Sequence, residues 1–129
     1  MPVKSPVSTS NAFLFNVTRK TLLSQDGKVL RGLSTAKGAM FSGLPGSLVL
    51  VWWREGRIAI TNWFVPEALD IVWVSAAWKV VHIRESFPAG AWKTVNDAPA
   101  MYVVELPAGT VSKTKTRVGD TIRCRDFAK

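Results

Sequence analysis

The feature that most constrains the fold is a set of short runs in which every side chain is apolar. Leu48–Trp53 and Ile71–Val74 are such runs. Successive side chains of a β-strand point to opposite faces, so a strand of this kind must be covered on both faces. Gly, Pro and Asp separate the runs and favour turns. The pattern predicts a mainly β fold, a single compact antiparallel β-sandwich or barrel with one or two short helical turns.

The strands expected from this pattern span residues 12–18, 28–32, 47–54, 57–64, 70–75, 79–86, 101–106 and 120–125. Tight hairpin turns are predicted at Asp26-Gly27, at residues 54–57 and at residues 75–78. Helical turns are predicted within residues 32–38 and 110–116. Residues 1–11 are polar and rich in Ser, Thr and Pro, so we expect a flexible leader followed by one domain over residues 12–129.

A chain of 129 residues fits one domain. It contains no apolar run long enough to span a bilayer, and its first residues lack the apolar stretch of a secretory signal. We therefore expect a cytoplasmic protein, unless a leader has been trimmed. Cys124 is the single cysteine, so no intrachain disulfide can form. A buried thiol is expected there, with a reactive thiol between Arg123 and Arg125 as the alternative.

The net charge is +8 and the isoelectric point about 10.2. Such an excess favours nucleic acid or another polyanion as partner, although it also suits a solvated surface. Part of the charge gathers near the C-terminus, where Asp120 and Asp126 dilute it. The candidate polyanion-binding residues there are Lys113, Lys115, Arg117, Arg123 and Arg125.

Several short motifs occur in a characteristic order. They are Arg31-Gly32-Leu33, Gly46–Val51, Asn62 followed by Pro66 and Leu69–Val74, and Tyr102–Gly109 followed by Val118–Asp120. Together they resemble the uncharacterised DUF192 (UPF0127) family over roughly residues 12–124. The resemblance implies a small, mainly β domain without an established activity. The chain departs from the family pattern at Ala59–Trp63, which stands where the family has Trp-Met-Lys-Asn-Thr, and at an apparent Glu67-Ala68 insertion.

Four residues are candidates for a ligand-binding rim, namely Asn62, Trp63, Asp70 and Glu105. The two carboxylates sit near the ends of apolar strands, where a buried charge needs a partner. Each residue also has a structural alternative: a backbone contact for Asn62, core or interface packing for Trp63, a turn or cap for Asp70, and an ion pair for Glu105. No catalytic motif, cofactor or metal site is predicted, because His82 is the single histidine and Cys124 the single cysteine.

The leading hypothesis is a non-catalytic module that binds a small molecule or another protein. A second is a nucleic-acid or polyanion binder that uses the basic C-terminal residues. A third is a small hydrolase or lyase that combines Asp70 or Glu105 with His82. A fourth is a homodimer that buries some of the six tryptophans between its subunits.

Overall fold

The computed structural model describes residues 8–33, 47–62 and 66–127. Within these ranges the chain forms strands and one short helix. In chain order they are β1 (Ser8–Asn16), β2 (Thr21–Leu33), β3 (Leu48–Gly56), β4 (Ala59–Ile60), β5 (Leu69–Val74), β6 (Val80–Phe87), β7 (Thr94–Val95), β8 (Ala100–Pro107), α1 (Thr110–Thr114) and β9 (Ile122–Phe127). The expected mainly β fold is confirmed. No helix in the described part is long and apolar enough to cross a membrane.

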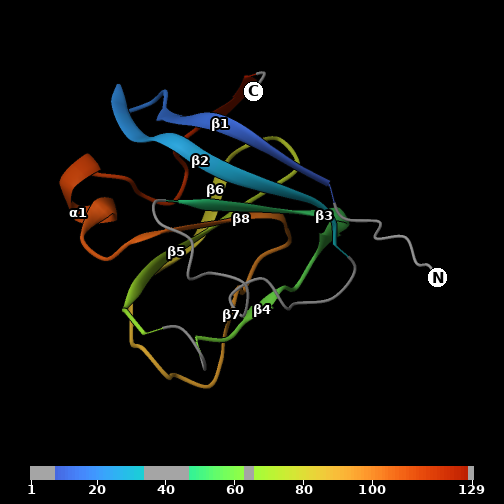
Figure 1. Cartoon of the computed structure of the whole chain (residues 1–129), viewed down its shortest axis with the longest axis vertical. Helices are drawn as coiled ribbons and strands as arrows, with labels where there is room; N and C mark the ends of the chain where they lie inside the picture. Colours follow the sequence, from blue (N-terminus) through green and yellow to red (C-terminus); the bar gives the residue numbers. More distant parts are fainter. Residues whose placement is uncertain (1–7, 34–46, 63–65, 128–129) are drawn as a thin grey trace.

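Seven strands form one sheet in the order β6-β5-β8-β3-β2-β1-β9, and β4 pairs with β7 in a small second sheet (Figure 1). The strand pairings of the described residues are antiparallel except that of β2 with β3, which is parallel. The mostly antiparallel pairing expected from the hairpins is confirmed, but the parallel pair makes the sheet mixed. That reasoning considers strands joined by short turns, and residues 34–47 separate β2 from β3.

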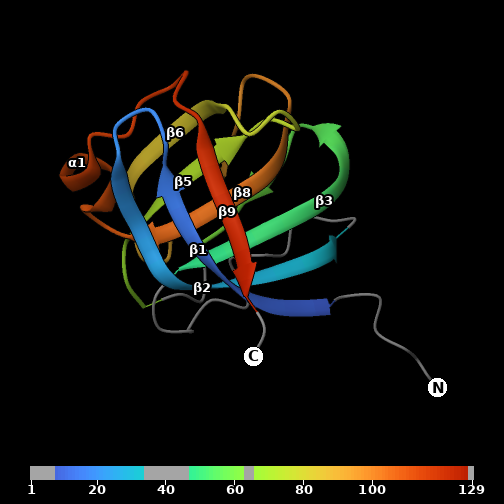
Figure 2. The same cartoon turned by 90° about the horizontal axis from the view of Figure 1, so that it is seen from above.

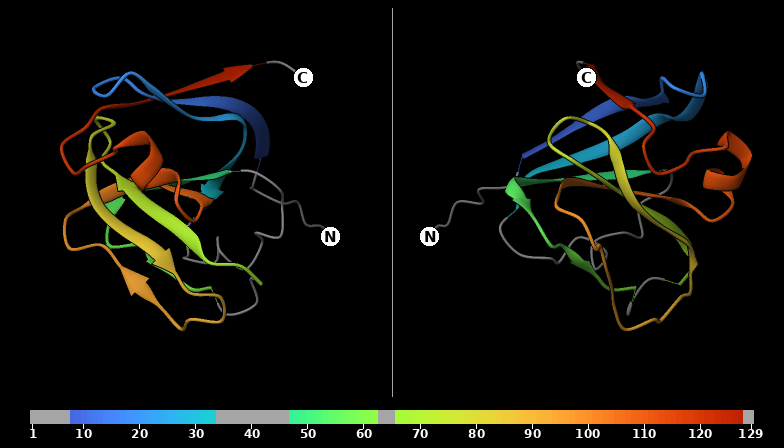
Figure 3. Two further views of the ribbon diagram at one scale, coloured as in Figure 1. Left: turned by 90° about the vertical axis from the view of Figure 1, so that its left-hand side faces the viewer. Right: turned by 180° about the vertical axis from the view of Figure 1, so that it is seen from behind.

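The large sheet curls until its two edge strands meet at their first residues. The backbones of Lys79 and Thr121 form an isolated antiparallel β-bridge. The N–H of Val80 donates to the carbonyl of Asp120 at 2.8 Å, and the N–H of Ile122 donates to the carbonyl of Trp78 at 2.9 Å. Figure 3 shows the result, with the blue and red strands β1, β2 and β9 on one side of the molecule and the yellow strands on another. The fold is a partly closed barrel.

The central strands bury side chains on both faces, as their uniformly apolar sequences predicted. One cluster, here called the inner core, lies inside the curled sheet and includes Leu14, Val29, Val49, Val72, Val74, Val80, Val104, Leu106, Val111 and Ile122. The other, here called the outer core, includes Leu48, Leu50, Trp52, Ile58, Ile60, Ile71, Trp73, Phe87 and Val103. Strands β3, β5 and β8 contribute to both clusters, which explains why they do not alternate.

The turn predicted at Asp26-Gly27 is wrong, because both residues lie within β2. The hairpin between β1 and β2 instead turns at residues 17–20. Gly27 serves a different purpose: it faces Ala12 beside a register shift, and a Cβ added there would lie 3.3 Å from Leu14 Cδ1. The glycine thus permits a close approach at a β-bulge rather than a turn.

Some of the other local predictions are confirmed and others are wrong. The hairpin over residues 75–78 and the helical turn within residues 110–116 are confirmed. The hairpin at residues 54–57 is wrong, because β3 pairs with β2 and β8 and not with β4. Residues 8–11, expected in the leader, belong to β1, where they pair with β2. Most of residues 32–38 lies outside the described residues.

Candidate functional site

Asp70 on β5 is a fully buried carboxylate that binds the backbone of two other segments. It accepts hydrogen bonds from the N–H groups of Ser86 at 2.9 Å, Gly109 at 3.1 Å and Val111 at 2.8 Å. The last two groups belong to the start of α1, whose cap residue Gly109 has φ +97°. Three donors satisfy the buried charge. The carboxylate thereby fixes α1 and the end of β6 against β5.

Asn62 is also fully buried and bonded to backbone. Its side-chain nitrogen lies within 2.8–3.1 Å of the carbonyl oxygens of Glu67, Phe87 and Pro88. Its backbone carbonyl accepts from the N–H of Gly90 at 2.7 Å. These contacts hold the segment after β4 to the end of β6. Trp63, predicted beside Asn62, lies outside the described residues.

The register of β5 against β8 separates the two candidate carboxylates. Asp70 is opposite Leu106, and Glu105 is opposite Ile71. Directly opposed residues of an antiparallel pair share a face. Since Leu106 belongs to the inner core and Ile71 to the outer core, Asp70 and Glu105 lie on opposite faces of the sheet. The structure does not bring them together at one rim.

His82 on β6 is opposite Trp73 and so faces the outer-core side. Its Nδ1 lies 3.1 Å from the carboxylate of Asp97, which is 78% exposed, and its ring meets that of Trp73 edge-on with centroids 5.0 Å apart. Asp70 faces the opposite side of the sheet from His82. Glu105 faces the same side as His82, but it is opposite Ile71, two residues along β5 from Trp73. The pairing of His82 is thus with Asp97, a residue that sequence reasoning did not select.

Asp120, buried behind the β1–β2 turn, forms the centre of a polar network. Its Oδ2 accepts from Asn16 Nδ2 at 3.0 Å, Arg19 Nε at 3.0 Å and the N–H of Arg117 at 2.9 Å. Burial raises the pKa of this carboxyl, but the hydrogen bonds and the Arg19 charge outweigh burial and hold the pKa below its usual range. The carboxylate joins β1 to the segment before β9.

Cys124 is half-buried in β9. Burial raises the pKa of its thiol to about 11; the Asp126 carboxylate also raises the pKa, and Arg31 opposes both effects. The thiol is therefore protonated at neutral pH, which favours the expected buried thiol over a reactive one.

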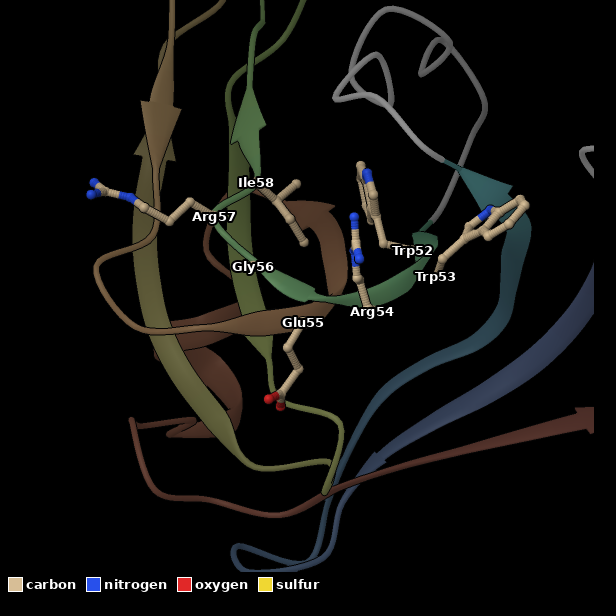
Figure 4. A pocket seen from close by; sticks show the side chains of 7 residues that line it. All are labelled: Trp52, Trp53, Arg54, Glu55, Gly56, Arg57 and Ile58. Carbon is tan, nitrogen blue, oxygen red and sulfur yellow. The ribbon is translucent and has the colours of Figure 1, made fainter.

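A cavity of about 520 Å³ is lined by residues Trp52–Ile58, which form the second half of β3 and the two residues after it. Figure 4 shows the side chains of Trp52, Arg54 and Ile58 projecting toward the same space, with Arg57 directed away from it. A cavity of about 240 Å³ lies at the open end of the curled sheet, where the Trp78 and Tyr102 rings stack with centroids 3.9 Å apart. Neither cavity is lined by Asn62, Asp70, His82 or Glu105.

Charge is divided sharply between two parts of the fold. Residues 8–33 and 110–127, which form β1, β2, α1 and β9, contain nine Lys and Arg against three Asp, a net charge of +6. Residues 47–107 contain five Lys and Arg against six Asp and Glu, a net charge of −1. Most of the net charge of +8 therefore belongs to one layer of the molecule.

The acidic residues near the C-terminus do not cancel this charge on the outer surface. Asp120 is buried and hydrogen-bonded to Arg19. Asp126 pairs with Arg31 and lines the cavity at the open end of the sheet. The predicted dilution of the basic cluster by these two residues is thus smaller in the structure than the sequence indicates.

The outer surface of this layer combines arginines with aromatic rings. Arg125 is directly opposite Phe13, and Arg123 is directly opposite Phe15. Phe13 is 43% exposed, and Leu22 on β2, opposite Phe15, is 44% exposed. We call these five residues the β9–β1 face. Figure 2 looks onto the three strands that carry it, β9, β1 and β2.

Three other predicted polyanion-binding residues, Lys113, Lys115 and Arg117, are exposed on α1 and the segment after it. The hydroxyl of Thr21 on β2 donates to the carbonyl of Thr114 at 3.0 Å, which holds α1 beside the start of β2. All five predicted basic residues therefore lie in the same layer. Sequence reasoning missed Phe13, Phe15 and Leu22. The signal available was the alternation of buried and exposed residues in Ala12–Phe15 and Ile122–Arg125.

Comparisons with known proteins show the family and the fold. Residues 28–124 match the DUF192 family, described as an uncharacterized ACR. The chain is 29% identical over 94 residues to UPF0127 protein PH1112 of Pyrococcus horikoshii, covering 70% of this chain and 79% of that protein.

Two solved structures share the fold. One is a candidate transcription regulator from Sinorhizobium meliloti, with a TM-score of 0.70, 15% identity and coverage of 95% of this chain and 98% of that one. The other is a protein of unknown function from Novosphingobium aromaticivorans, with a TM-score of 0.72, 15% identity and coverage of 95% and 92%. At this identity the likeness concerns the fold alone. The family match, which spans most of the sequence, shows that this chain belongs to the DUF192 family.

Proposed function

We propose that this protein is a non-catalytic binding module that holds a polyanion against the layer formed by β1, β2, α1 and β9. The observation that carries the proposal is the separation of charge: a net +6 in this layer against −1 over residues 47–107. A single-signed surface attracts an oppositely charged polymer and raises its rate of association. The buried carboxylate of Asp70, by contrast, is engaged in the fold through three backbone hydrogen bonds.

Arg123 and Arg125 are the residues expected to contribute most. Both are exposed on β9 and point to the same side of that strand, because each is opposite an outward residue of β1. Guanidinium groups bind phosphate or sulfate oxygens with two parallel hydrogen bonds. Lys113, Lys115 and Arg117 extend the basic surface on the other side of β2.

Duplex DNA and heparin are suitable probes, since both are polyanions that require no identified ligand. Binding of the wild-type protein to duplex DNA should weaken steeply between 50 and 200 mM salt, as displaced counterions predict. The double substitution Arg123→Gln/Arg125→Gln should lower the slope of log K against log salt by about 1.8, the contribution of two phosphate contacts. It should also lower the salt concentration that elutes the protein from heparin.

Arg54→Gln/Arg57→Gln is the matched control, because it removes the same charge from exposed positions around the end of β3. This variant should bind nearly as the wild type does. Equal losses in the two double variants would show an effect of net charge alone and refute the assignment to this layer. Absence of salt-dependent binding to duplex DNA, to heparin and to a single-stranded oligonucleotide would refute the proposed function.

A small-molecule ligand is the second candidate function, favoured by the cavity at the open end of the sheet. It has room for about eight water molecules, and its wall includes the stacked rings of Trp78 and Tyr102. Trp78→Leu should abolish binding of a small aromatic ligand found by screening; unchanged binding would place the ligand elsewhere. The ligand-binding set predicted from sequence, Asn62, Trp63, Asp70 and Glu105, stays a prediction.

A further inference from the structure

We infer that the polyanion bound by the β9–β1 face is a single-stranded nucleic acid, whose bases stack on Phe13 and Phe15 while Arg125 and Arg123 contact its phosphates. This inference rests on the proposed function and specifies its ligand. The juxtaposition that supports it is given by the register of β1 and β9, which places each arginine directly across from one of the two rings.

The spacing of the rings fits unstacked bases. Phe13 and Phe15 are two residues apart on one strand, so their Cα atoms are separated by about 6.8 Å along the strand. This is about twice the 3.4 Å rise of a base within a duplex strand. Neighbouring bases that each stack on one ring must therefore separate from each other. A single strand permits that separation, whereas a duplex resists it.

The pairing of β1 with β9, which places the arginines beside the rings, is regular. The pairing of β1 with β9 continues without interruption from Asn11 opposite Phe127 to Asn16 opposite Ile122. The register shifts of β1 occur against β2, on its other side. Neighbouring strands lie about 4.8 Å apart, so a guanidinium beside each ring can reach the phosphate of a nucleotide stacked on that ring.

Two other polyanions fit this surface less well. Reading a duplex in its major groove requires a helix or a two-stranded β-ribbon that enters the groove. The one helix in the described part of the chain has five residues, and β1 lies between β2 and β9 in the seven-stranded sheet instead of in a separate ribbon. Sulfated polysaccharides lack the flat aromatic bases that stack on an exposed ring such as that of Phe13 or on the accessible part of the half-buried Phe15 ring. The combination of arginine with an aromatic ring that is 43% exposed at Phe13 is the arrangement that single-stranded nucleic acids use.

The test compares a fluorescent oligothymidylate of twelve nucleotides, the same sequence annealed to its complement, and heparin. Phe13→Leu removes a ring and keeps an apolar side chain, and Phe13→Trp restores an aromatic surface. Trp92→Leu is the matched control, because Trp92 is 65% exposed in the segment between β6 and β7, outside the basic layer. Far-UV circular dichroism and thermal unfolding of each variant establish that it is folded.

Phe13→Leu should weaken binding of the single strand about tenfold, within the range measured for loss of one stacked base. Its affinity for heparin should change less than twofold, and Phe13→Trp should restore binding of the single strand. Phe15→Leu should act in the same direction as Phe13→Leu, and Trp92→Leu should have no effect. Arg123→Gln/Arg125→Gln should weaken binding of both the single strand and heparin.

Unchanged binding of the single strand by both phenylalanine variants would overturn the inference while leaving the polyanion proposal in place. Equal or tighter binding of the duplex would also overturn it. Absence of salt-dependent binding to all three probes would refute the proposed function and this inference together.

Discussion

Replacement of Asp70 tests whether this carboxylate is a structural anchor. In the wild type it accepts three backbone hydrogen bonds while fully buried. Asp70→Ala leaves three buried donors without that acceptor, and each lost bond of this kind costs about 1–3 kcal/mol. Since these costs are not fully additive, we expect the free energy of unfolding to fall by about 3–6 kcal/mol.

Asp70→Asn refines the test because its amide retains one acceptor oxygen. Placed at the position of Oδ2, that oxygen keeps the bonds from Gly109 and Val111 and loses only the bond from Ser86. The expected loss is then about 1–3 kcal/mol. Urea unfolding at neutral pH, followed by tryptophan fluorescence, measures both variants. The control Asp97→Ala alters a carboxylate that is 78% exposed and should cost less than about 1 kcal/mol.

A change below about 1 kcal/mol for Asp70→Ala would refute this reasoning. A loss for Asp70→Asn as large as that for Asp70→Ala would refute it as well, because the retained oxygen would then have no effect.

The remaining predictions concern one thiol, one carboxylate and one glycine. Because the pKa of Cys124 is raised to about 11, its alkylation by iodoacetamide should be slow at pH 7.5 and should still accelerate above pH 9.5; a plateau near pH 9 would contradict this. The lowered pKa of Asp120 gives a stabilisation that is complete above the unfolded pKa of about 3.9 and is lost as pH falls through the lower folded value. Asp120→Asn should therefore flatten the acid side of the stability profile in urea unfolding, and a profile parallel to the wild type would argue against the network. Gly109→Ala should cost about 1–2 kcal/mol because its φ is +97° with open space around the added Cβ. Gly56→Ala, which has open space without a positive φ, should cost much less, and equal costs would contradict the backbone explanation.

The parts of the fold that follow from local sequence could be predicted. Leu48–Trp53 and Ile71–Val74 are apolar at every position, and the structure covers both faces of β5 and of β3 as far as Trp52. Trp53 at the end of the first run is 71% exposed, so the prediction was wrong at that position. The Asp26-Gly27 turn failed because this dipeptide, favourable in turns, lies in β2 beside a register shift, where a Cβ on residue 27 would lie 3.3 Å from Leu14 Cδ1. Turn propensity is a local quantity, and long-range packing decided this position.

The candidate site depended on pairings that local sequence does not contain. Asp70 and Glu105 both lie beside apolar runs, yet only the register of β5 against β8 reveals that they face opposite sides of the sheet. Phe13 and Arg125 are far apart in the chain, and only the pairing of β1 with β9 brings them together. The basic residues could be predicted from charge. The aromatic rings beside them required the topology.

The central claim, that the layer of β1, β2, α1 and β9 is the binding surface, is tested most directly by amide chemical-shift mapping with the twelve-nucleotide oligothymidylate. The largest changes should occur at residues 11–15 and 122–125, with smaller ones at Leu22 and along α1. They should diminish as salt is raised. Changes centred on Trp52–Ile58 or on Trp78 and Tyr102, with the β9–β1 face unaffected, would contradict the claim and place the binding site in one of the cavities.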